Sequence, residues 1–108
     1  MDIDLLEQRI AENQNKMPSH QHASKRDSVD LQMVMVNSSL THEYARKAYE
    51  KCSSYHKKIE ILERMESLKN LYYDARQRLA DINPDKLDSV ERELYLQKQN
   101  VFSDITVQ

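Results

Sequence analysis

Apolar side chains recur at alternating steps of three and four residues along most of this chain, a spacing that places them on one face of an α-helix. The clearest run extends from Ile61 to Ile82 without a missing position. Its members are Ile61, Met65, Leu68, Tyr72, Ala75, Leu79 and Ile82. We therefore predict a long amphipathic helix here, with one face buried against another helix.

A second helix is predicted to fold back along this run. Asn83-Pro84-Asp85 should end the first helix, because proline disfavours helical backbone in the residue before it. Leu87, Val90 and Leu94 then resume the same spacing. Two such runs joined by a short turn predict an antiparallel helical hairpin, with the returning helix over residues 85–103.

The preceding part of the chain is predicted to extend the first helix, so that it covers residues 28–82. Val29, Met33, Val36 and Leu40 follow the helical spacing, and we expect this apolar face to have no cover within the chain unless the N-terminal helix folds back, which makes it a partner site. A strand over 29–36 is the alternative, but no second strand is predicted to pair with it. The sequence Asn37-Ser38-Ser39 makes 37–41 a candidate break. A thinner run continues the pattern through Ala45, Ala48, Cys52, Tyr55, Ile59 and Leu62.

The start of the chain predicts a short helix and a connection. Ile3, Leu6 and Ile10 share one face of an amphipathic helix over residues 1–13. Residues 14–27 are polar and contain Pro18, which predicts a flexible linker. The expected fold is therefore all-α: an elongated helical hairpin, or a coiled-coil-like small bundle, with a short N-terminal helix.

Composition supports helices and argues against an enzyme. The 108 residues contain no glycine, although average usage is about 7%, so a glycine-rich phosphate-binding loop is excluded. No metalloprotease motif is present, because Arg46 stands four residues after His42 where a second histidine is required. We expect no catalytic residues and no cofactor.

Cysteine and histidine offer one weak candidate for metal binding. Cys52 and His56 have i, i+4 spacing, and His20 and His22 could add ligands from the predicted linker. We interpret Cys52 as a small buried residue and His56 as solvated, and expect no metal. A single cysteine rules out an intrachain disulfide, and no apolar run is long enough to span a membrane. We therefore expect a cytoplasmic or other reducing intracellular location.

Charge is distributed unevenly around a net value of −2. Residues 42–78 hold nine basic and six acidic side chains, whereas residues 1–41 and 79–108 are both net acidic. A nucleic-acid-associated regulator that uses the basic 46–78 region is thus the alternative function. Because carboxylates interleave with these bases, we interpret the region as a solvated helix face, and nucleic acid is not the expected partner.

The function that we predict is protein–protein interaction, by an adaptor, an assembly subunit or a small chaperone that presents apolar helix faces to a partner or to a second copy. Tyrosine and arginine are enriched at the centres of protein interfaces. We accordingly expect the partner to bind at Val36, Leu40, Tyr49, Tyr73 and Arg76.

Overall fold

The computed structural model describes residues 3–18 and 25–96, and these form an all-α bundle, as predicted. No strand occurs within these residues, and none of their helices is both long enough and apolar enough to cross a membrane. The elements are α1 (Ile3–Lys16), the short 3-10 helix η1 (Lys25–Asp27), α2 (Ser28–Lys51), α3 (Tyr55–Ile82) and α4 (Pro84–Leu96).

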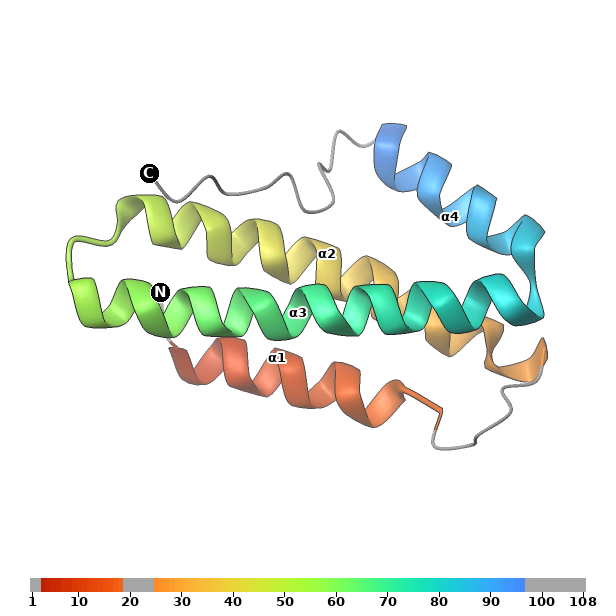
Figure 1. The fold of residues 1–108 in the computed structure, drawn as a ribbon, viewed down its shortest axis with the longest axis horizontal. Coiled ribbons are helices and arrows are strands. Elements are labelled where there is room, and N and C mark those ends of the chain that lie inside the picture. The colour runs from red at the N-terminus through yellow and green to blue at the C-terminus, as the bar shows by residue number, and fades with distance from the viewer. Residues whose placement is uncertain (1–2, 19–24, 97–108) are drawn as a thin grey trace.

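Helices α2 and α3 lie side by side and antiparallel, and they form the centre of the molecule (Figure 1). The bundle measures 44 × 28 × 18 Å. Its long dimension is that of α3, whose 28 residues extend about 42 Å at 1.5 Å per residue. Helix α1 packs against both α2 and α3, and α4 folds back from the end of α3 toward α2.

The predicted single helix over 28–82 is wrong, because the chain turns at Cys52–Ser54. Helix α2 passes without interruption through 37–41, where we expected the break. Ser54 starts α3 as its N-cap: it has extended backbone, and its hydroxyl accepts a hydrogen bond of 3.5 Å from the backbone N–H of Lys57. The two halves therefore pack on each other instead of forming one rod.

The fold-back buries one face of α2 and leaves the predicted apolar row largely uncovered. Val29, Met33 and Leu40 are exposed, as expected for a row without cover inside the chain, and Val36 is half-buried. Leu31, on the opposite face, is fully buried, and so is Ala45 of the thinner run. Two other residues of the thinner run are exposed: Tyr55, with 73% of its surface accessible in the first turn of α3, and Ile59.

The predicted hairpin between α3 and α4 is present. Leu79 on α3 belongs to the same buried cluster as Leu87 and Val90 on α4. Helix α4 begins at Pro84, one residue earlier than predicted, and its expected continuation to residue 103 lies outside the described residues. Helix α1 continues to Lys16, past the predicted end at residue 13, and residues 19–24 of the predicted linker also lie outside the described part.

Two apolar clusters hold the bundle together, one at each end. The smaller cluster joins α1, α2 and α3 through Leu6, Ala45, Ile61 and Met65. The larger cluster joins α2, α3 and α4 and consists of Leu31, Val34, Met35, Tyr72, Ala75, Leu79, Leu87, Val90 and Leu94.

Between these clusters, the buried face of α2 is polar. This polar belt consists of Ser38, Ser39, Thr41 and His42. Burial lowers the pKa of His42 from 6.5 to about 4, and nearby Lys69 lowers it further, so the imidazole is neutral at physiological pH.

Candidate functional site

The outward face of α2 carries a row of large apolar side chains that the bundle does not cover. Val29, Met33, Leu40 and Tyr44 are spaced by four, seven and four residues, which places them on one face of the helix. Their exposed fractions are 63%, 40%, 46% and 51%. We call these four residues the outer α2 row.

A groove between α1 and α2 adjoins this row. Its cavity measures about 340 Å³ and is lined by Leu5, Leu6, Arg9, Leu40, Thr41 and Tyr44. Leu6 is fully buried, whereas Leu40 and Tyr44 belong to the outer α2 row. The α1–α2 groove is therefore mainly apolar, with one guanidinium among its lining residues.

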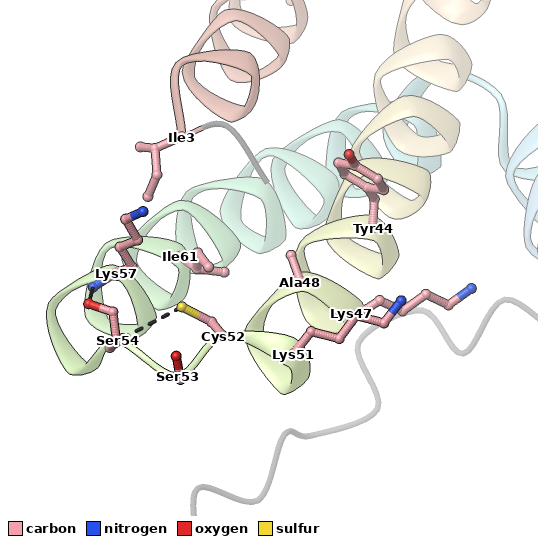
Figure 2. Close-up of a pocket in the computed structure, with 10 residues that line it drawn as sticks. All are labelled: Ile3, Tyr44, Lys47, Ala48, Lys51, Cys52, Ser53, Ser54, Lys57 and Ile61. Atoms are coloured by element: carbon pink, nitrogen blue, oxygen red, sulfur yellow. Dashed lines mark hydrogen bonds between the residues drawn. The ribbon is translucent and has the colours of Figure 1, made fainter.

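A second, larger cavity of about 480 Å³ lies at the turn between α2 and α3 (Figure 2). Lys47 and Lys51 come from the last turns of α2, and Lys57 comes from the first turn of α3. Figure 2 shows the Lys57 side chain beside Ile3 of α1. The other lining residues are Tyr44, Ala48, Cys52, Ser53, Ser54 and Ile61. We call this cavity the lysine pocket.

The residues that line the lysine pocket carry a net positive charge. Among the described residues that line it, three are lysines and none carries a carboxylate. The positive end of the α3 dipole and the negative end of the α2 dipole both lie at this turn and offset each other, so the lysines set the sign of the charge. This positive charge favours a negatively charged ligand group.

Tyr44 connects the two cavities. Its side chain lines both the α1–α2 groove and the lysine pocket, so the two form one continuous surface along α1 and α2. From Leu40 to Lys51 this surface follows eleven residues of α2, about 16 Å at 1.5 Å per residue. That length corresponds to three turns of a helix laid along it.

Three of the expected partner-binding residues lie on α2, and two of them, Val36 and Leu40, lie near its middle. Leu40 is exposed and lines the α1–α2 groove. Val36 is half-buried and packs against the larger apolar cluster. The predicted partner face therefore meets the groove at Leu40, whereas Val36 contributes to the core.

The two expected tyrosines are far apart. Tyr49 is half-buried beneath Lys58, whose Nζ lies 5.1 Å from the ring centre in a cation–π contact. Tyr73 is exposed, and its ring meets that of Tyr72 edge-on at 5.5 Å. Tyr73 follows Lys58 by fifteen residues of α3, about 22 Å. The structure does not bring Tyr49 and Tyr73 into one patch, and their role in partner binding stays a prediction.

Arg76, the fifth expected residue, contacts α4. Its Nε lies 2.5 Å from Oε1 of Glu91, in an ion pair between half-exposed side chains. The other arginines of the basic 46–78 region are also paired. Arg46 binds Glu43 and Glu50, Arg64 binds Glu7 and Glu63, and Arg78 binds Asp74.

The two candidate metal ligands within the described residues, Cys52 and His56, lie on different elements. Cys52 and His56 were expected on one helix, but the turn between α2 and α3 separates them. The Cys52 thiol donates to the carbonyl oxygen of Ser54 at 3.6 Å, and His56 is exposed. No group of three potential ligands occurs within residues 3–18 and 25–96, and His20 and His22 lie outside them.

The sequence analysis did not predict that Leu5 and Tyr44 would line a groove, or that Lys47, Lys51 and Lys57 would line one cavity. The four-residue step from Leu40 to Tyr44 could have extended the predicted partner face toward the lysines. Comparisons with protein-family models, with curated proteins and with solved structures find no match to this chain. The site is therefore interpreted from its own residues.

Proposed function

We propose that this chain is a non-enzymatic protein–protein interaction module whose α1–α2 groove binds a helical segment of a partner protein. The outer α2 row is the observation that carries the proposal, because four large apolar side chains exposed on one helix face are typical of an interaction surface. Adaptors, assembly subunits and small chaperones work in this way.

The shape of the surface supports a helix as the occupant. A groove between two helices accepts the side-chain ridge of a third, and an amphipathic helix would place its apolar face against Leu5, Leu40 and Tyr44. Such a helix adds to the bundle without requiring any rearrangement of α1 or α2.

Charge supports a different protein rather than a second copy of this chain. A twofold antiparallel pairing of two outer α2 rows about their midpoint would set Lys47 against Arg26 of the other copy. A parallel twofold pairing would set Lys47 against its own equivalent. Both arrangements bring like charges together, which opposes association.

The nucleic-acid alternative has less support from the same contacts. Arg46, Arg64, Arg76 and Arg78 are all held in ion pairs with carboxylates of this chain. Their charge is therefore partly neutralised, which weakens the case for a basic face along 46–78.

A pair of matched substitutions tests the proposal. Leu40→Asp introduces a charge into the groove, and Leu96→Asp introduces the same charge at an exposed leucine of α4 that does not line it. Proteins captured from an extract of the source cells by both variants and by the unchanged chain are quantified by mass spectrometry. We expect one protein that is retained by Leu96→Asp and lost by Leu40→Asp, with both variants melting like the unchanged chain.

Two results would contradict the proposal. The first is capture that is identical for both variants, which would place the partner elsewhere. The second is a doubled mass in light scattering that only Leu40→Asp reduces to 12.8 kDa, which would assign the outer α2 row to self-association.

A further inference from the structure

The lysine pocket is the feature that the proposed function leaves unexplained. Lys47, Lys51 and Lys57 line one cavity from two helices; in Figure 2 the side chains of Lys47 and Lys51 extend to one side of it and that of Lys57 to the other, beside Ile3. No ion pair holds any of the three among the described residues, whereas all four arginines between residues 46 and 78 are paired. Their charge therefore remains available to a ligand.

We infer that the partner segment is an acidic amphipathic helix, whose apolar face occupies the α1–α2 groove and whose carboxylates lie at one end, in the lysine pocket. This inference rests on the proposed function and adds the chemistry of the partner and its direction along α2. Continuity through Tyr44 and charge complementarity at Lys47, Lys51 and Lys57 carry it.

The geometry of the two cavities sets the length of the partner helix and the end at which its acidic residues lie. Leu40 and Lys51 are about 16 Å apart along α2, so three turns of a bound helix cover the groove and the pocket together. Apolar residues at i, i+3 and i+7 face Leu5 and Leu40, and aspartates or glutamates follow at one end, beyond Tyr44. The acidic end is expected at the N-terminus of the bound helix, where carboxylates also favour the helix dipole.

The energetic contribution of the pocket is modest and sensitive to salt. Exposed ion pairs are individually weak, so the groove supplies most of the affinity and the lysines supply discrimination between partners and a faster association rate. Raising the ionic strength should weaken binding through the lysines and leave the apolar contribution in place.

A display selection with the full chain tests both the groove and the pocket. The probe is a library of random peptides of three to four helical turns, selected against the immobilised protein. One selected peptide is then titrated against two triple variants with equal changes in net charge. The first variant is K47E/K51E/K57E in the pocket, and its control is R26E/K86E/R92E, at exposed bases that line neither cavity.

We expect the selected peptides to combine helical apolar spacing with acidic residues at one end. K47E/K51E/K57E should weaken binding at low ionic strength about tenfold, because three attractions become repulsions, and the control should change it less than about twofold. High ionic strength should remove most of that difference. Leu40→Asp should abolish binding at both ionic strengths.

Each alternative result of this experiment would overturn either the inferred chemistry of the partner or the proposed function as well. Peptides that need Leu40 but show no acidic preference overturn the inference and leave the proposed function intact. Selection of no peptide that depends on Leu40 overturns both. If the selected peptides share a consensus that matches residues 97–108, the groove binds that segment of this chain instead of a partner protein. Binding of a labelled DNA duplex that K47E/K51E/K57E abolishes and Leu40→Asp retains assigns the lysines to nucleic acid.

Discussion

Arg76 of α3 and Glu91 of α4 form an ion pair that spans the hairpin turn, with 2.5 Å between Nε and Oε1. The pair lies beside Tyr72, whose pKa is raised to about 12 by burial, with a smaller contribution from the Glu91 charge. The guanidinium of Arg76 thus links α3 to α4, and the role of Arg76 in partner binding stays a prediction.

A double-mutant cycle on Arg76→Ala and Glu91→Ala measures the strength of this link. Because both side chains are more than a third exposed, we expect a coupling free energy of only about 0.5 kcal/mol in urea unfolding. A coupling above about 2 kcal/mol would show that the pair acts as a buried one.

The hairpin core should be far less tolerant. Leu79→Asp places a charge among Leu87, Val90 and Tyr72, where it has no partner, and should lower the free energy of unfolding by at least about 3 kcal/mol. Asn70→Asp, an exposed position on the same helix, is the control and should change it by less than about 0.5 kcal/mol. Thermal melting followed by circular dichroism measures both, and equal melting temperatures would contradict the α3–α4 contact.

The sequence predicted α3 and α4 well because their apolar residues keep one spacing. Every member of the run from Ile61 to Leu79 is buried, and the proline turn is where expected. The turn at Cys52–Ser54 was missed because it contains neither glycine nor proline. The helical spacing of apolar residues also continues across the turn through Ala48, Cys52 and Tyr55.

The outer row of α2 could be predicted because its apolar residues extend past the reach of the α3–α4 hairpin. The structure leaves Val29, Met33 and Leu40 exposed, whereas the fold-back of α3 buries another face of α2 that carries Leu31 and the polar belt. That buried face could not be predicted as long as 28–82 was interpreted as one helix.

One hydroxyl of the polar belt predicts a stabilising substitution. The Ser38 hydroxyl is fully buried and has no hydrogen-bond partner among the described residues. Ser38→Ala removes this desolvated group and improves helix propensity, so the free energy of unfolding should rise by about 1 kcal/mol.

Ser39→Ala is the matched control for this change. The neighbouring Ser39 is also buried, but it does have a polar interaction. Its replacement should leave stability unchanged or lower it by about 1 kcal/mol. Equal stabilisation by both substitutions would mean that helix propensity alone is responsible.

His42 predicts how stability depends on pH. Its pKa is about 4 in the folded chain and about 6.5 when unfolded, so the unfolded state binds the proton more readily. Stability should be complete above about pH 6.5 and fall as the pH is lowered toward about 4, by up to about 3 kcal/mol in total.

His42→Gln should flatten this profile between about pH 7 and about pH 5, a range that lies above the pKa of most carboxylates. His56→Gln, at an exposed histidine outside the polar belt, is the control, and its stability should depend on pH as that of the unchanged chain does. Urea unfolding at each pH is the measurement. A profile that His42→Gln leaves unaltered would contradict the burial of a neutral imidazole.

Helix α1 forms one wall of the groove, and it is attached through the buried residues Leu6 and Ile10 and the ion pair of Glu7 with Arg64. None of the buried residues of the larger cluster belongs to α1, so we expect α1 to detach at a lower free energy than that required to unfold α2, α3 and α4. The proposed binding surface would therefore have an opening equilibrium of its own. A partner that contacts both walls would slow the hydrogen exchange of α1 amides, and substitutions that loosen α1 would reduce affinity by the fraction of molecules left open.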